Sequence, residues 1–213
     1  MTYIENIFIC LAIPMLLSLF FTGGRARRFT LFVILGMGVC LLSAYISSFF
    51  MQYYRTDAVT TAIEIAPVCE ELMKLLPLLF YFLVLEPEPR QLPAAAIAVA
   101  VGFATFENVC YLTENGAENT AFLLIRGVSA GALHILCGIL AGFGISYMFR
   151  RRWLALAGTV GTLGACICLH AIYNLLITAD GGWRLAGYLL PSGLIVLLFA
   201  ARQLLAARRP PQA

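Results

Sequence analysis

Seven long apolar stretches dominate the sequence and decide the environment in which it can fold. They cover residues 4–22, 29–51, 61–85, 93–112, 121–149, 153–178 and 185–206. Each is close to the roughly 20 residues that an α-helix needs to cross the hydrocarbon core of a bilayer. Only 12% of the residues are charged and the mean hydropathy is +0.91, whereas soluble domains carry about 25% charged residues. The sequence therefore predicts a multi-pass membrane protein.

The same stretches predict the fold class. Backbone amides and carbonyls have no water to bond with inside lipid, so single membrane-crossing segments of this length form helices. We therefore expect an all-α membrane protein, a polytopic bundle of about seven transmembrane helices. The loops between the stretches are too short to hold another domain. Residues 1–213 are predicted to form a single integral membrane domain, with a motif-bearing core at about 61–178.

Arginines in the loops predict the orientation of the bundle. One side would carry ten of them: Arg25, Arg27, Arg28, Arg90, Arg150, Arg151, Arg152, Arg202, Arg208 and Arg209. The other side would carry three: Arg55, Arg126 and Arg184. Cytoplasmic loops hold the excess of basic residues, so the amino terminus is predicted outside and the carboxyl terminus in the cytosol. Arg126 is expected near the outer interface, in contact with water.

The basic residues do not indicate nucleic-acid binding. They are spread over several loops, and no platform of alternating aromatic and basic residues accompanies them. The net charge of +3 is explained by the basic loops. The expected surroundings are the lipid bilayer and other membrane proteins.

Charged residues interrupt the third apolar stretch. Within APVCEELMKLLPLLFYFLVL, residues 66–85, Glu70, Glu71 and Lys74 lie well inside the predicted span. A charge at a helix centre costs about 2.5–3.5 kcal/mol on insertion scales, so such groups face the bundle interior or a wet cavity. The next three spans add further polar residues: Glu107, Asn108, His134, His170 and Asn174. Counted from the predicted outer ends of the helices, their depths are compatible with one shared layer in the outer half of the membrane.

Carboxylates and histidines in one layer are the groups that hydrolysis by activated water requires. A buried carboxylate can accept a proton from water, and histidine can act as base, acid or metal ligand near neutral pH. Two histidines and a glutamate also form an acceptable catalytic Zn²⁺ set, here Glu107, His134 and His170. No HExxH motif is present, so this metal hypothesis depends on convergence in space.

Other interpretations of the same residues stay open. Glu70 and Lys74 lie four residues apart on one helix face and would also suit a simple neutralising ion pair. Buried Glu, His and Lys can form the proton or cation path of an ion-coupled transporter or channel. The polar residues can also bond between helices in a membrane scaffold without catalysis.

Four motifs in successive spans resemble those of the PrsW family of intramembrane proteases. Glu70-Glu71-Leu-Met-Lys74 matches EExxK, and Phe103-Ala-Thr-Phe-Glu107-Asn108 matches FAxxEN. His134, followed by His170-Ala-Ile-Tyr-Asn174, completes the pattern. The related CAAX-type prenyl endopeptidases of the same superfamily more typically show EExxxR and FxxxH. This chain has Leu75 and Glu107 at the distinguishing positions, which favours the PrsW family.

The resemblance implies an intramembrane endopeptidase of the bacterial cell membrane. Its substrate would be a single-span membrane protein, an anti-sigma factor cleaved near the extracytoplasmic side. The resemblance assigns water activation to Glu70 and Glu71, with His170 as their partner and Glu107 and His134 as further site residues. Asn174 would be an oxyanion donor or an orienting residue, and Lys74 and Asn108 would support the site. Both Zn²⁺ and water activated by glutamate alone stay open as mechanisms.

Overall fold

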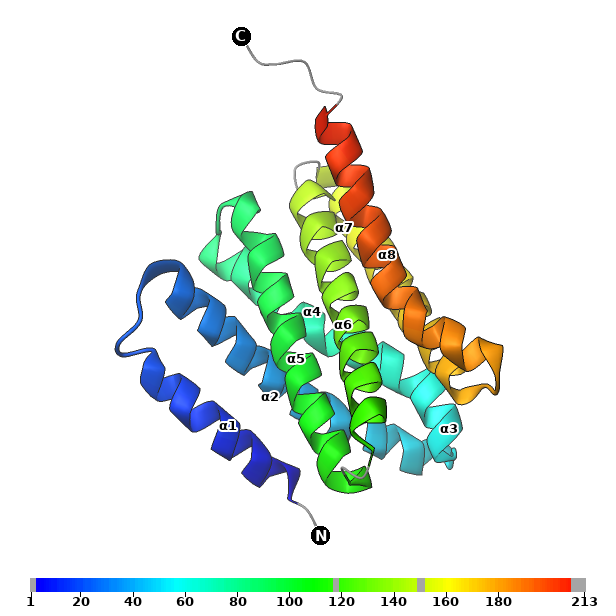
Figure 1. The fold of residues 1–213 in the computed structure, drawn as a ribbon. Helices are drawn as coiled ribbons and strands as arrows, with labels where there is room; N and C mark the ends of the chain where they lie inside the picture. The colour runs from blue at the N-terminus through cyan, green and yellow to red at the C-terminus, as the bar shows by residue number, and fades with distance from the viewer. Residues whose placement is uncertain (1–2, 117–118, 149–151, 208–213) are drawn as a thin grey trace.

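Helices account for nearly all of the described residues, and no strand occurs among them. The computed structural model describes residues 3–116, 119–148 and 152–207 (Figure 1). The long helices are α1 (Ile4–Ser18), α2 (Gly24–Tyr54), α4 (Ala66–Leu85), α5 (Leu92–Asn115), α6 (Thr120–Met148), α7 (Arg152–Thr178) and α8 (Gly182–Ala207). Three short segments join them: α3 (Ala58–Thr60), the π-helical turn η1 (Thr61–Ile65) and the 3₁₀ turn η2 (Pro89–Gln91). The predicted all-α fold is confirmed.

Five of the long helices, α2, α5, α6, α7 and α8, are long and apolar enough to cross a membrane. The 20-residue helix α4 has the necessary length but carries Glu70, Glu71 and Lys74. The apolar helix α1 has only 15 residues and ends at Ser18, where the sequence predicted a span to residue 22. Residues 19–21 form a turn, and Gly23 then precedes the first residue of α2, Gly24. Exposed apolar side chains cover much of the exterior of the bundle, as lipid contact requires.

The two ends of the described chain lie on opposite sides of the bundle. Helix α1 starts at one end and α8 finishes at the other (Figure 1). The seven membrane crossings that the sequence predicts would also place the two ends on opposite sides. Arg150, Arg151, Arg208 and Arg209, which contribute to the predicted orientation, lie outside the described residues. The assignment of the amino terminus to the outside stays a prediction.

Helix α5 occupies the middle of the bundle and packs closely against α2 and α6. Its side chains there are small or fully buried, including Ala98, Val99 and Phe103. Two glycines allow the backbones of α2 and α5 to touch. A Cβ at Gly36 would collide with the backbone carbonyl of Val99, and a Cβ at Gly102 with that of Val33. Small residues permit this kind of close approach between membrane helices.

We expect Gly102→Ala to destabilise the protein by about 1–3 kcal/mol, because the added methyl group must push α2 and α5 apart. Gly131→Ala on α6 is the matched control, since a Cβ there meets no other atom within 4 Å. The control should be neutral or slightly stabilising, because alanine favours helix over glycine. Thermal unfolding in detergent measures both variants. Equal stability of the two variants would contradict a close contact between α2 and α5.

Candidate functional site

A π-helical turn directly precedes α4, the helix that carries Glu70 and Glu71. The chain is helical from Ala58 to Leu85, through α3, η1 and α4. Within η1 the bonds span five residues, so the amide of Ala66 donates to the carbonyl of Thr61. The next bond in that series would run to the carbonyl of Ala62, but residue 67 is proline and has no N–H. Such turns are frequent at functional sites.

Asn174 supplies the donor that the proline removes. Its Nδ2 lies 2.7 Å from the backbone oxygen of Ala62 and donates to it. Asn174 belongs to α7, so this bond ties α7 to the segment that precedes α4. Asn174 therefore contributes here by holding the helix that carries the two glutamates.

We expect Asn174→Ala to destabilise the protein by about 1–3 kcal/mol, because the carbonyl of Ala62 loses its partner inside the bundle. Asn6→Ala is the matched control, since Asn6 is exposed on α1. The control should change stability by no more than about 0.5 kcal/mol. Chemical or thermal unfolding in detergent distinguishes the two. A neutral Asn174→Ala would show that the bond to Ala62 does not stabilise the fold.

Lys74 lies between Glu71 and His134. Its Nζ is 2.6 Å from Glu71 Oε1 and 2.8 Å from His134 Nδ1. An ammonium group can only donate, so His134 Nδ1 accepts and the ring proton lies on Nε2. That nitrogen donates to Glu107 Oε2 at 2.6 Å. Both ring nitrogens of His134 are therefore engaged.

His170 is held by Glu71 and faces Glu70. His170 Nδ1 lies 2.8 Å from Glu71 Oε1 and donates to it. When the ring is neutral, its one N–H proton is on Nδ1, and Nε2, which lies 3.7 Å from Glu70 Oε2, is an acceptor. That oxygen is buried and accepts no hydrogen bond from the described residues. Two acceptor atoms then face each other with no donor from the described part of the chain, and buried polar atoms of this kind normally bind water or an ion.

The six side chains Glu70, Glu71, Lys74, Glu107, His134 and His170 form one polar cluster. Four are buried, with exposed fractions of 5% for Glu71, 6% for Lys74, 1% for His134 and 3% for His170. The side chains of Glu70 and Glu107 are more open, at 15% and 30%. Hydrogen bonds hold the four buried side chains in place. A reactant can therefore approach from the side of Glu70 and Glu107, whose side chains are more exposed.

Arg126 contacts this cluster through Glu107, and the sequence did not predict this contact. Its Nη2 lies 3.3 Å from Glu107 Oε1, and its Nη1 donates to Asn108 Oδ1 at 2.5 Å. The guanidinium also covers the ring of Tyr111, 3.6 Å from the ring centre. Only 16% of the side chain is exposed. Glu107 and Asn108 draw Arg126 toward the bundle, and the expectation that it also contacts water near the outer interface stays a prediction.

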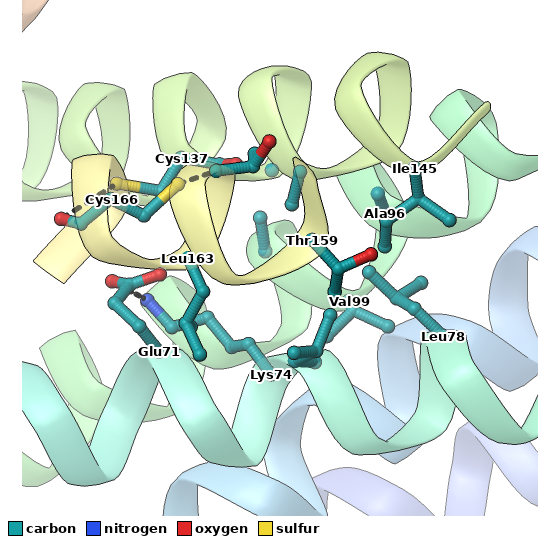
Figure 2. Close-up of a pocket in the computed structure, with 15 residues that line it drawn as sticks. Glu71, Lys74, Leu78, Ala96, Val99, Cys137, Ile145, Thr159, Leu163 and Cys166 are labelled. Carbon is teal, nitrogen blue, oxygen red and sulfur yellow. Dashed lines mark hydrogen bonds and ion pairs between the residues drawn. The ribbon is translucent and has the colours of Figure 1, made fainter. Parts of the chain in front are cut away.

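A small cavity adjoins the closed side of the cluster. Figure 2 shows the carboxylate of Glu71 and the amine of Lys74 directed toward each other at one end of it, near Cys137 and Cys166. The cavity holds about 20 Å³, which is enough for one water molecule. Beyond the ion pair its walls are mostly apolar, with Leu78, Ala96 and Val99 among them. Water can therefore reside beside the ion pair.

Two groups of side chains have the donor types that a metal ion needs. Glu70, His134 and His170 offer ligand atoms that all lie within 4.8 Å of one another. The sequence predicted Glu107 as the carboxylate of this set, but Glu107 pairs with His134 and Arg126 instead. The second group is Glu71, Cys137 and Cys166. Its two thiols each donate to the backbone oxygen of the other cysteine, at 3.9 and 3.6 Å, and so pack α6 against α7.

The structure brings together most of the residues that the sequence singled out. The six charged and histidine residues of the polar cluster meet, while Asn108 is reached through Arg126 and Asn174 bonds the backbone of η1. Their roles in catalysis stay predictions. Arg126 could have been suspected from its position eight residues before His134, since residues so spaced share one face of a helix.

Comparisons with known proteins give a consistent result. The profile of the family described as PrsW family intramembrane metalloprotease matches residues 25–202. The chain is 31% identical over 117 residues to Protease PrsW of Bacillus subtilis (strain 168), covering 52% of this chain and 49% of that protein. It is 30% identical over 115 residues to Protease PrsW of Geobacillus kaustophilus (strain HTA426), covering 54% and 48%. The chain thus spans about half the length of the curated relatives it matches. No solved structure is significantly similar to it.

Proposed function

We propose that this chain, which belongs to the PrsW family of intramembrane metalloproteases, hydrolyses a peptide bond of a membrane-anchored protein at its polar cluster. The observation that carries the proposal is the pair of facing acceptor atoms, Glu70 Oε2 and His170 Nε2. They lie 3.7 Å apart, and the glutamate oxygen is buried and has no donor among the residues that the structure describes. A water molecule is the smallest group that donates to two acceptors at once.

Glu70 and His170 would hold this water and take its proton. As the water oxygen attacks the carbonyl carbon of the substrate, its proton passes to the Glu70 carboxylate, which then protonates the leaving amine nitrogen. The peptide bond breaks and one water molecule is consumed. Glu71 fixes the orientation of His170, and Lys74 fixes Glu71. Asn174 positions the start of α4 rather than contacting the reacting atoms.

The donor set also fits the metal ion that the family name implies. Glu70, His134 and His170 would hold it, with two imidazoles and one carboxylate as in known catalytic zinc sites. Such an ion, when bound, lowers the pKa of its water to about 7. Glu71 would support the site as the carboxylate behind a ligating histidine, a contact already formed at 2.8 Å. To bind the ion, His134 would give up one of its two hydrogen bonds, either to Lys74 or to Glu107.

The substrate would be a single-span membrane protein of the anti-sigma factor type, cut near the extracytoplasmic side. Two observations support this side of the membrane. Glu70 lies in the second turn of α4, whereas Arg90 and the arginines at the start of α2, Arg25 and Arg28, lie at the opposite end of that helix. Basic loops are cytoplasmic. A CAAX-type endopeptidase would instead hold its site near the cytosolic face.

The test is cleavage in proteoliposomes that contain the purified protein and candidate single-span anti-sigma factors. We expect two fragments whose new ends, identified by mass spectrometry, lie in or next to the substrate's membrane span. A chelator should stop cleavage, and added Zn²⁺ should restore it, if the ion takes part. Intact substrates combined with proton-coupled uptake of ions would favour the transporter instead. Cleavage of a prenylated carboxyl-terminal peptide would favour the CAAX-type activity.

A further inference from the structure

A second, larger cavity lies at the opposite end of α4 from the polar cluster. It measures about 710 Å³ and is formed by the start of α2, the end of α4, η2 and the start of α5. We call it the arginine pocket, after Arg25, Arg28 and Arg90, which line it together with Phe32, Tyr81 and Gln91. Its volume is within the range of about 300–1,000 Å³ that is typical of ligand pockets.

Hydrogen bonds give the arginine pocket a fixed inner wall. The oxygen Gln91 Oε1 accepts from Arg28 Nη1 at 2.6 Å and from the hydroxyl of Tyr81 at 2.9 Å. The rings of Phe32 and Tyr81 pack edge to face, 4.8 Å apart, and are buried. Gln91, which also accepts from Tyr81, therefore holds the guanidinium of Arg28 in place before any ligand arrives.

The arginine pocket has more positive than negative charge. It is lined by three arginines and one glutamate. Arg90 and Glu88 neutralise each other, since their Nε and Oε2 atoms lie 2.9 Å apart. Within the described part of the chain, Arg28 bonds the neutral Gln91 and forms no ion pair, and Arg25 is exposed and forms no ion pair either. Two guanidinium charges are thus left to bind an anion, and their planar forks suit the oxygens of a phosphate.

The position of the arginine pocket indicates where that phosphate comes from. It lies at the ends of membrane helices, with Phe29, Ala94 and Ala95 giving an apolar side next to the arginines. This is also the end of the bundle that is predicted to face the cytosol, and the cytoplasmic leaflet is rich in anionic lipids. Basic pockets between membrane helices on this side bind anionic headgroups. We propose that the arginine pocket binds the phosphate of an anionic phospholipid headgroup.

The midpoint of thermal unfolding of the full chain is measured in a neutral detergent at increasing concentrations of short-chain phosphatidylglycerol. Parallel titrations use short-chain phosphatidylcholine and inorganic phosphate. The test variant is Arg25→Gln with Arg28→Gln. The matched control is Arg27→Gln, which removes the same kind of charge from an exposed position on the same turn of α2 outside the pocket. No step requires proteolysis, so the result is independent of the proposed catalytic function.

We expect phosphatidylglycerol to raise the midpoint of unfolding with saturable binding. Two pocket arginines should contribute about 30-fold in affinity, or about fivefold each. The double variant should therefore bind about 30-fold more weakly, and Arg27→Gln within twofold of the wild type. If the double variant fails to fold, Arg25→Gln alone, which breaks no described bond, should bind about fivefold more weakly.

Three outcomes would overturn the assignment. Equal stabilisation by phosphatidylcholine would show that the negative headgroup charge does not matter. Equal weakening by Arg27→Gln and by the pocket variants would indicate attraction to the whole basic surface rather than to a site. Inorganic phosphate that matches phosphatidylglycerol at the same concentration would assign the pocket to a soluble phosphate instead of a lipid.

Discussion

Glu70→Gln is expected to lower the rate of substrate cleavage by about 10²–10⁴-fold, the usual contribution of a general base. Glutamine keeps the size of the side chain but cannot take a proton from water. Glu70 Oε2 accepts no hydrogen bond from the described residues, so the substitution breaks none there. The free energy of unfolding should therefore change by no more than about 1 kcal/mol. Initial rates of fragment formation in proteoliposomes and thermal unfolding in detergent provide the two measurements.

Glu64→Gln is the matched control for this prediction. Glu64 lies on the same continuous helical segment, within η1, but its side chain is exposed and outside the polar cluster. The control should cleave within about twofold of the wild type, because surface substitutions have small effects. If Glu70→Gln cleaves as fast as the control, Glu70 does not activate the water. Loss of stability together with activity would instead give Glu70 a structural role.

The fold and the gathering of the polar residues could be predicted from the sequence for a simple physical reason. Lipid leaves helices as the only solution for single long apolar segments, and it makes a buried charge costly. Glu71, Lys74 and His134 therefore had to meet other polar groups inside the bundle. Approximate depths along each helix could also be predicted, because the rise per residue of a helix is constant.

The partners within the polar cluster could not be predicted in the same way. Whether Lys74 bonds Glu71 alone or also His134 depends on how α4 and α6 are rotated about their axes, which packing determines. The different environments of Glu70 and Glu71 are a further example. They are neighbours in the sequence, yet Glu71 accepts two hydrogen bonds, whereas Glu70 has a buried oxygen with no donor among the described residues.

The start of α4 gives a second example of this limit. Pro67 can be read from the sequence as a residue that has no backbone N–H to donate. The structure shows a π-helical turn next to it and places Asn174 against the free carbonyl of Ala62. The bond joins residues 112 positions apart. No local pattern contains that pairing, so Asn174 was predicted from its motif as a site residue and not as a donor to the backbone.

Lys74→Met is expected to destabilise the protein by about 3–5 kcal/mol, the usual cost of breaking a buried ion pair from one side. The ammonium group is buried and contacts Glu71 at 2.6 Å and His134 at 2.8 Å. Without it, the Glu71 carboxylate stays buried with His170 as its one hydrogen-bond partner among the described residues. Arg202→Met on α8 is the control, since Arg202 is exposed and forms no ion pair with the described residues. Its stability should change by no more than about 0.5 kcal/mol.

A double variant separates the charge of Glu71 from its shape. Glu71→Gln removes the unpaired charge, while the amide oxygen can still accept from His170 Nδ1. Combined with Lys74→Met, it should recover at least about half of the lost stability, because replacing both partners of a buried pair costs less than removing one. Unfolding in detergent of both single variants and the double variant gives the coupling energy. Additive losses would mean that Lys74 and Glu71 stabilise the bundle independently, and the ion pair would then not explain how His170 is held.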